Sequence, residues 1–229
     1  MRLPAVFAAG AEETELADLE LPLDLDRLVA GSGVWEVELG FGKGRYLLAR
    51  ASQSPERRFL GVELASRYYR LALRRARHQA LDNLLLVRGE ALFLLAAVLP
   101  RAFAATLHVY FPDPWPKSRH TKRRLFDPET VDLVLGILRP GGELYFATDF
   151  LDYGERVAEI LHGFPGLTVE TRADPWPEGP RTNYEAKYAR EGRPILRLSG
   201  RLAAAAGDFR LHPEGADGIV AATADRRNR

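Results

Sequence analysis

The chain has 229 residues, of which 46% are hydrophobic and 28% are charged, the composition of a globular protein with a substantial core. Its 32 Lys and Arg residues nearly balance its 31 Asp and Glu residues, so the net charge favours no class of partner. The absence of cysteine excludes disulfides, thiolate nucleophiles and Cys-based zinc sites, and the five histidines lack metal-ligand spacing.

Local charge and periodicity divide the sequence into three segments. Residues 10–26 hold seven acidic residues and no basic one, and we assign residues 1–32 to an acidic N-terminal extension. Residues 33–202 are predicted to form one domain, and residues 203–229 a loosely ordered tail with a short strand near 218–222. The first apolar run is short and contains a proline, and no run approaches the roughly 20 residues that span a bilayer. We therefore predict a cytoplasmic protein without a cleaved signal.

From Gly33 onward, short β-like runs alternate with segments that have apolar residues at helical spacing. The runs are 34–40, 58–63, 84–87, 105–111, 143–148 and 194–202, and the helical segments are 43–53, 65–80, 90–98 and 128–138. This alternation predicts an α/β fold with a mostly parallel sheet covered by helices on both faces. Such sheets bind ligands beyond the carboxyl ends of their strands, so the residues after each run are candidates for a functional site.

Three glycines follow the first run, in the sequence Glu38-Leu-Gly40-Phe-Gly42-Lys-Gly44. Closely spaced glycines between a strand and a helix let the backbone approach a ligand and direct helix amides toward it. A tight turn with only a packing role is the alternative. The spacing differs from the GxGxxG of dinucleotide sites, and Glu38 would repel a pyrophosphate. Glu38 would attract a cationic ligand such as S-adenosylmethionine, which carries an ammonium and a sulfonium but no phosphate.

Acidic residues also follow the second and third runs. Glu63 comes nineteen residues after Gly44, where a carboxylate can accept hydrogen bonds from both hydroxyls of an adenosine ribose. An acid that only stabilises the start of a helix is the alternative. Glu90 follows the third run, where its carboxylate would meet the adenine amino group unless it only begins the next helix.

The fourth run leads into prolines around an acid and then into a basic arm. Pro112-Asp113-Pro114-Trp115-Pro116 is predicted to be a stiff loop, because proline fixes φ and removes amide donors. Residues 117–124 hold five basic residues and no acidic one, which favours contact with an RNA backbone. The alternatives are a structural turn capped by Asp113 and a solvated helix face. A second Asp-Pro-Trp-Pro at 174–177 lacks matching flanks and is interpreted as a coincidental repeat in a loop.

Four blocks make the chain resemble the bacterial tRNA (guanine-N7)-methyltransferases. They are residues 38–44, residues 111–124 with the sequence FPDPWPKSRHTKRR, residues 147–149 and residues 182–185, and the resemblance runs from about residue 34 to residue 198. The second block is highly specific, whereas the glycine turn is shared by many methyltransferases. The resemblance implies a Rossmann-like class I methyltransferase with a central, mostly parallel seven-stranded sheet. It implies methyl transfer from S-adenosylmethionine to N7 of guanosine 46 in the tRNA variable loop, without a metal, by a monomer or homodimer.

The resemblance also assigns roles to individual residues. The cofactor site comprises Glu38, Gly40, Gly42, Gly44, Glu63, Glu90 and Asp113. The target base is placed near Lys117, Asp149, Thr182, Asn183, Tyr184 and Glu185, with Glu185 predicted on a loop that closes over the RNA. Contact with the RNA backbone is assigned to Arg119, His120, Thr121, Lys122, Arg123 and Arg124. The third acid is often aspartate in the family, and the tail beyond Ser199 has no counterpart there.

Asp113 is the predicted catalytic residue. Guanine N7 carries a lone pair and no proton, so its attack on a sulfonium methyl needs no strong base. Positive charge leaves sulfur and appears on the purine ring during the transfer. We expect Asp113 to orient the guanine through its N–H donors and to offset this charge, while in-line placement supplies most of the acceleration.

Two rival functions match parts of the sequence. An amino-methyltransferase acting on adenine or cytosine has a (D/N)PP(Y/F) motif after the fourth strand, which Asp113-Pro-Trp resembles only loosely. A non-enzymatic RNA-binding module has no need for acids at several strand ends. Two aromatic residues have two interpretations each: Tyr184 stacks on a base or packs in the core, and Trp115 is a stacking platform or a hydrophobic pin.

Overall fold

The computed structural model describes residues 5–8, 14–15, 21–29, 33–115 and 124–204. The strands are β1 (Ala5–Ala8), β2 (Thr14–Glu15), β3 (Trp35–Leu39), β4 (Arg58–Glu63), β5 (Leu84–Arg88), β6 (Ala104–Tyr110), β7 (Leu138–Thr148), β8 (Leu167–Arg172) and β9 (Leu196–Leu202). The helices are α1 (Leu25–Leu28), α2 (Arg45–Gln53), α3 (Ser66–His78), α4 (Ala91–Ala97), α5 (Val131–Leu135), α6 (Leu151–His162) and α7 (Asn183–Arg190).

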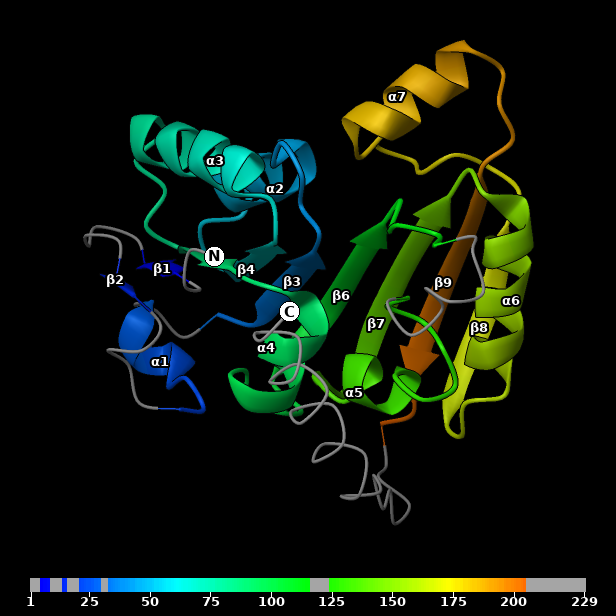
Figure 1. Cartoon of the computed structure of the whole chain (residues 1–229), viewed down its shortest axis with the longest axis horizontal. Helices are drawn as coiled ribbons and strands as arrows, with labels where there is room; N and C mark the ends of the chain where they lie inside the picture. Colours follow the sequence, from blue (N-terminus) through cyan, green and yellow to red (C-terminus); the bar gives the residue numbers. More distant parts are fainter. Residues whose placement is uncertain (1–4, 9–13, 16–20, 30–32, 116–123, 205–229) are drawn as a thin grey trace, which may run out of the picture.

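The strands of these residues join one sheet in the order β2-β1-β5-β4-β3-β6-β7-β9-β8 (Figure 1). Strands β3 to β7 run parallel to one another, and β9 lies antiparallel between β7 and β8. The seven strands β3–β9 confirm the predicted seven-stranded, mostly parallel sheet. The segment that we assigned to an acidic extension adds β1 and β2 to the same sheet, because β1 pairs with β5.

The strand order reverses at β3, in the middle of the sheet. The chain passes from β3 outward through β4 and β5 and then returns to β6 on the other side of β3. Doubly wound sheets bind ligands at the carboxyl ends of the strands beside such a reversal. The predicted acids lie in or after successive strands at this edge: Glu38, Glu63, Glu90, Asp113 and Asp149.

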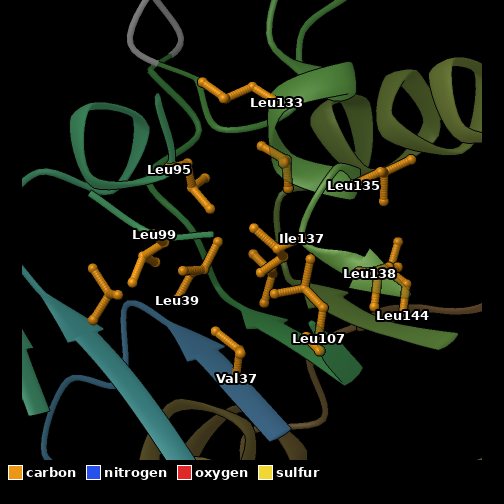
Figure 2. Close-up of a cluster of buried hydrophobic side chains, with 14 of the residues drawn as sticks. Val37, Leu39, Leu95, Leu99, Leu107, Leu133, Leu135, Ile137, Leu138 and Leu144 are labelled. Atoms are coloured by element: carbon orange, nitrogen blue, oxygen red, sulfur yellow. The ribbon is translucent and has the colours of Figure 1, made fainter. Parts of the chain in front are cut away.

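The two faces of the sheet are buried differently. On one face, Val37, Leu39 and Leu107 pack against leucines from α4 and α5, as Figure 2 shows. On the other face, α2 and α3 cover β4 and β5 through a second apolar cluster. Successive side chains of a strand point to opposite faces, so β3 directs Glu36 and Glu38 toward the α2 face. The two acids are therefore buried beneath a helix, close to the reversal point.

Most of the predicted elements are present, but six of the observed elements were not predicted. The predicted runs form β3, β4, β5, β6, β7 and β9, and the predicted helical segments form α2–α5. The sequence analysis did not predict β1, β2 or α1 in the N-terminal segment, nor α6, α7 or β8. Strand β8 is an edge strand with one buried residue, Leu167, and its polar sequence resembles that of a loop. The tail beyond residue 204 and its predicted strand lie outside the described residues. In the described parts of the chain, no helix has the length and apolar character needed to cross a membrane.

Candidate active site

The glycine turn after β3 is open at two positions and closely packed at the third. Gly40 and Gly42 have φ of 76° and 54°, and a Cβ added to either would meet nothing within 4 Å. A Cβ on Gly44 would lie 3.2 Å from Ala72 and 3.3 Å from Leu48, where α2 crosses α3. Gly40 and Gly42 therefore leave the backbone accessible to a ligand, whereas Gly44 permits helix packing.

Glu63 joins the end of β4 to the glycine turn. One carboxylate oxygen accepts a hydrogen bond from the Gly42 amide at 2.8 Å, and the other accepts one from the Ala65 amide at 2.7 Å. Burial raises the pKa of Glu63, the backbone amides partly oppose the shift, and the charge of Asp113 adds to it. The Asp113 carboxylate thus lies near enough to Glu63 for the two charges to interact. Each Glu63 oxygen keeps a lone pair with which to accept another donor.

Glu38 is a buried acid with one unpaired oxygen. Its side chain is 2% exposed, and its Oε2 atom has no hydrogen-bond donor among the described residues. Burial raises the pKa of Glu38 to about 8; a backbone hydrogen bond opposes this shift, and the charge of Glu63 adds to it. An unpaired buried carboxylate is unfavourable unless a donor or a cation reaches it. Beside the open glycine turn, Glu38 is therefore suited to a positively charged ligand.

Glu90 caps a helix. It is the N-cap residue of α4, and its carboxylate accepts hydrogen bonds from the amides of Leu92 and Phe93 at 3.2 and 2.8 Å. A side-chain acceptor at this position satisfies amides that have no partner within the helix. The structure therefore confirms the capping interpretation of Glu90, and its contact with a cofactor stays a prediction.

Asp113 is exposed in the middle of a strained loop. The flanking residues Phe111 and Trp115 have φ of 52° and 41°, values that bulky side chains adopt only under constraint. Arg124 supplies part of this constraint, because its Nε and Nη2 donate to the carbonyls of Pro114 and Trp115 at 2.8 and 3.2 Å. Arg124, predicted to contact RNA, thus binds the loop itself. The rest of the basic arm, residues 117–123, lies outside the described residues.

The segment that we predicted to be a loop able to close over RNA is the helix α7. Thr182 caps this helix by accepting a hydrogen bond from the Glu185 amide at 3.0 Å. Glu185 is only 1% exposed, and its two oxygens accept from the Arg181 amide at 2.9 Å and from Arg197 Nε at 2.8 Å. The loop assignment of Glu185 is therefore wrong. Its local sequence, Thr-x-x-Glu, is a helix-capping pattern that was available as a signal.

The exposed side of α7 carries aromatic rings instead of packing them inward. Tyr184 is 51% exposed, so its predicted alternative of packing in the core is wrong. Its ring stacks on Tyr188 with centroids 5.9 Å apart and lies 6.2 Å from Phe111, at the end of β6. Asp149 follows β7 and lies 3.6 Å from Arg193 in an ion pair. These residues form an aromatic and charged surface beside the strained loop.

A buried polar network that the sequence analysis missed supports α7. Arg181 Nη1 donates to the Tyr110 hydroxyl at 2.5 Å, and His108 Nδ1 lies 2.8 Å from the same hydroxyl. Burial lowers the pKa of His108, and Glu36, whose Oε2 lies 3.4 Å from His108 Nε2, opposes this shift. Four rings surround the guanidinium of Arg181, with the nearest centroid 4.1 Å away: Trp176, Tyr145, Tyr46 and Tyr110.

Trp176 belongs to the second Asp-Pro-Trp-Pro, which we had interpreted as a coincidental repeat. Its side chain is buried, and it forms one wall around Arg181. Cations over aromatic faces are attracted by the ring quadrupole, more strongly when they are desolvated. The second copy therefore has a structural role, holding the residue that immediately precedes the Thr182 cap.

Comparison with known sequences identifies the family. A family described as putative methyltransferase matches residues 32–198. The tRNA (guanine-N(7)-)-methyltransferase of Nitrosococcus oceani is 36% identical over 177 residues, which cover 77% of this chain and 75% of the relative. That of Alkalilimnicola ehrlichii is 37% identical over 180 residues, with 77% and 76% covered. The chain belongs to the tRNA (guanine-N(7)-)-methyltransferase family.

Solved structures agree on the fold of this family member. An aminoglycoside-resistance methyltransferase superposes with a TM-score of 0.58 at 17% identity, covering 88% of this chain and 100% of that one. The 16S rRNA methyltransferase KamB gives a TM-score of 0.58 at 17% identity, with 86% and 98% covered. At this identity the likeness shows the fold alone, which is the predicted Rossmann-like class I methyltransferase fold.

The structure brings together only part of the site predicted for a member of this family. The glycine turn, Glu38, Glu63 and Asp113 lie at the carboxyl edge around β3, β4 and β6. Asp149 and α7 lie on the β7 side of the strained loop. Within the described residues, no group of three or more His, Asp or Glu residues is arranged to hold a metal ion.

Proposed function

We propose that this protein transfers a methyl group from S-adenosylmethionine to N7 of a guanosine in tRNA, at position 46 of the variable loop. The observation that carries the proposal is the buried, unpartnered oxygen of Glu38 beside the open glycine turn, in a chain of this family. A cation that reaches Glu38 favours its ionised form, which burial otherwise disfavours.

The residues around the glycine turn fit S-adenosylmethionine. Glu38 would pair with the ammonium group, and the backbone of Gly40 and Gly42 leaves room for the methionine moiety. Glu63 would accept hydrogen bonds from the ribose hydroxyls through its remaining lone pairs. When bound, the cofactor supplies a methyl group made electrophilic by its sulfonium.

Binding of the cofactor at pH 7 should release close to one proton per site. Glu38 has a raised pKa of about 8, so it is mostly protonated in the free protein and must ionise to pair with an ammonium. Because the ionised form binds, affinity rises as the pH increases toward 8. Calorimetric titration at pH 7 in buffers of different ionisation enthalpy measures the released protons.

Glu38→Gln is the matched control for this proton release. The variant should release no proton at this site and bind S-adenosylmethionine about 10- to 100-fold more weakly, through loss of a charged hydrogen bond. Equal proton release from wild type and Glu38→Gln would show that Glu38 does not face the ligand.

The position of Asp113 supports a role at the base. Its carboxylate is exposed at the carboxyl edge and interacts electrostatically with Glu63, so it lies between the proposed cofactor site and solvent. We propose that it accepts hydrogen bonds from the guanine N–H groups and stabilises the positive charge that appears on the ring. No proton has to leave N7, so the protein needs to supply no general base there.

The β7 side of the loop supplies contacts for the RNA. The exposed ring of Tyr184, stacked on Tyr188, is proposed to stack on a base, and Asp149 to accept a hydrogen bond from it. The arm of residues 117–123 is proposed to contact phosphates. Such contacts contribute to affinity for RNA but not to recognition of its base sequence.

The loop geometry argues against an amino-methyltransferase. The motif of those enzymes requires proline at the position of Trp115, which here has a φ of 41°. Proline fixes φ near −65°, so the loop of this chain differs in backbone conformation and in sequence. A non-enzymatic module is disfavoured for another reason, because it would keep one Glu38 oxygen buried and unpaired without any benefit.

Incubation of unmodified tRNA with the protein and isotope-labelled S-adenosylmethionine tests the proposal. Nucleoside analysis should find the label in 7-methylguanosine, and tRNA with adenosine at position 46 should remain unlabelled. Label in N6-methyladenosine or a methylated cytidine would favour the amino-methyltransferase, and no label together with no cofactor binding would favour the module.

A further inference from the structure

Arg181 lies where the cofactor side and the base side of the candidate site meet. The Cζ atom of its guanidinium is 5.1 Å from the ring centroid of Tyr46, in the first turn of α2, which follows the glycine turn. The guanidinium also donates to the hydroxyl of Tyr110, the last residue of β6. The next residue in the chain is Thr182, which caps α7. In Figure 1, α2 and α7 both lie at the end of the sheet toward which the arrow of β6 points.

The Arg181 guanidinium is held in one orientation. Its side chain is 8% exposed, and its Nε and Nη2 atoms each lie 2.6 Å from Glu178 Oε1. Its Nη1 atom is bonded to Tyr110, and the ring centroids of Trp176 and Tyr145 are 4.1 and 4.7 Å from its Cζ. Arginine presents its donors in a planar fork, so bonds and rings together fix it more firmly than a flexible ammonium would be. Arg181 can therefore fix the elements that surround it.

Packing alone does not require a charge at this position. Burial of an arginine has a desolvation cost, and apolar side chains of similar volume often stabilise a protein as well or better. The acid that pairs with Arg181 is Glu178, whose side chain is 47% exposed, so solvent screens the acid more strongly than the buried guanidinium. A positive potential therefore remains beneath α2, on the face of the sheet where Glu38 is buried.

The charge of Arg181 reaches Glu38. Burial raises the pKa of Glu38 to about 8; a hydrogen bond from the Leu47 amide opposes this shift, the charge of Glu63 adds to it, and the charge of Arg181 opposes it. Arg181 thus favours the ionised form of Glu38, which is the form that pairs with an ammonium. The other titratable or charged groups that interact with Arg181 are Tyr110, Tyr46, Glu178, Arg50 and His108.

We propose that Arg181 is a positioning residue for the methyl transfer, which holds the start of α7 against β6 and α2 and whose charge favours pairing of Glu38 with the cofactor ammonium. This inference rests on the proposed function, since it takes the cofactor to lie at Glu38 and the base to lie beside α7. The rate depends on in-line placement of the two reactants, so a small displacement of α7 relative to the glycine turn would slow the transfer.

Binding of S-adenosylmethionine to Arg181→Met as a function of pH tests the electrostatic part. Methionine fills much of the volume but removes the charge that favours ionised Glu38, so the rise of affinity with pH should shift to higher pH. At pH 7 the variant should bind about three- to tenfold more weakly than wild type, and the difference should shrink toward about pH 9. In a Glu38→Gln background, Arg181→Met should leave the pH dependence unchanged, because no carboxylate remains to respond.

Glu178→Gln should shift the pH dependence in the opposite direction. It removes the negative charge that partly neutralises Arg181, and its half-exposed position makes a large loss of stability unexpected. The stronger positive potential should favour ionised Glu38, so the rise of affinity should move to lower pH. Damage to packing would not give opposite shifts in the two variants.

Single-turnover methyl transfer to tRNA tests the geometric part. With saturating tRNA and cofactor, Arg181→Met should react about 10- to 100-fold more slowly than wild type, because the base and the methyl group are less well aligned. Arg181→Lys keeps the charge and should restore most of the pH dependence. It should restore less of the rate, since an ammonium cannot reproduce the planar contacts with Glu178 and Tyr110.

Arg58→Met is the matched control. Arg58 also lies over an aromatic ring, 4.9 Å from the centroid of Trp35, and its side chain is 12% exposed. It is the first residue of β4, at the amino edge of the sheet, and so lies away from the site. Its removal should lower the stability without changing the pH dependence of cofactor binding or the rate of transfer.

The proposal is overturned if Arg181→Met reacts at the wild-type rate, or if Arg58→Met slows the transfer equally. It is also overturned if Arg181→Met keeps the wild-type pH dependence while Glu38→Gln loses it, or if Arg181→Met and Glu178→Gln shift it in the same direction. Should Arg181→Met not fold, Arg181→Lys and Glu178→Gln decide.

A failure of the proposed function gives a different result. Cofactor binding that does not depend on pH in wild type, or that keeps its pH dependence in Glu38→Gln, would reject the pairing of Glu38 with the cofactor. The transfer rates of Arg181→Met and Arg58→Met would then still decide whether Arg181 is a positioning residue.

Discussion

Asp113→Asn is expected to lower the methyl-transfer rate at saturating tRNA and cofactor by about 100- to 1,000-fold. The substitution keeps the shape of the side chain but removes the negative charge that offsets the charge developing on the purine. It also replaces one hydrogen-bond acceptor by a donor, which would face the guanine N–H groups. Single-turnover kinetics measures the chemical step separately from product release.

Asp82→Asn is the matched control for this experiment, because Asp82 is exposed and lies next to the amino end of β5. It should react at the wild-type rate. Removal of the Asp113 charge should also lower the pKa of Glu63, so the variant should bind S-adenosylmethionine no more weakly than wild type. An Asp113→Asn protein with a wild-type rate would remove Asp113 from the catalytic role.

Arg197→Met is expected to destabilise the protein by about 3–5 kcal/mol, the range found when one partner of a buried ion pair is removed. Arg197 Nε lies 2.8 Å from Glu185, and both side chains are buried between α7 and β9. Methionine fills a similar volume but leaves the Glu185 carboxylate unpaired. Urea unfolding followed by circular dichroism measures the loss.

Two variants show whether the effect comes from the unpaired charge. Arg201→Met lies on the same strand with its side chain 70% exposed and should change the stability by no more than about 0.5 kcal/mol. Glu185→Gln/Arg197→Met removes both charges and should recover much of the lost stability. If Arg201→Met and Arg197→Met cost the same, the ion pair would not explain the position of α7.

This test also bears on the predicted role of Glu185 in binding the base. Its two oxygens are occupied by Arg181 and Arg197 in the structure, so substitution of Glu185 would disturb α7 and the exposed Tyr184 with it. Loss of activity in a Glu185 variant would therefore show a substrate contact only if the stability of the variant had been preserved.

The elements around the candidate site were predictable because their signals are local. Apolar runs and helical spacing located β3, β4, β5 and β6. The glycines and acids follow these strands within a few residues of the sequence, so their place at the strand ends was predictable as well. In contrast, α7 and β8 lie in a segment rich in proline and glycine, where local composition favours loops. Their formation depends on pairing of β8 with β9 and on burial of Glu185.

The sequence by itself determined the fold class, the family resemblance and the positions of Glu38, Glu63 and Asp113 at strand ends, because periodicity and connectivity are properties of neighbouring residues. Only the tertiary structure decided that Glu38 is buried with one oxygen unpaired, that Arg124 holds the proline-rich loop, and that Glu185 is paired inside the protein. Burial and partners depend on residues far apart in the chain, as in the hydrogen bond between Arg181 and Tyr110 across 71 positions. No local sequence pattern predicts such a contact, because it forms only when folding of the sheet places β6 next to the segment that precedes α7.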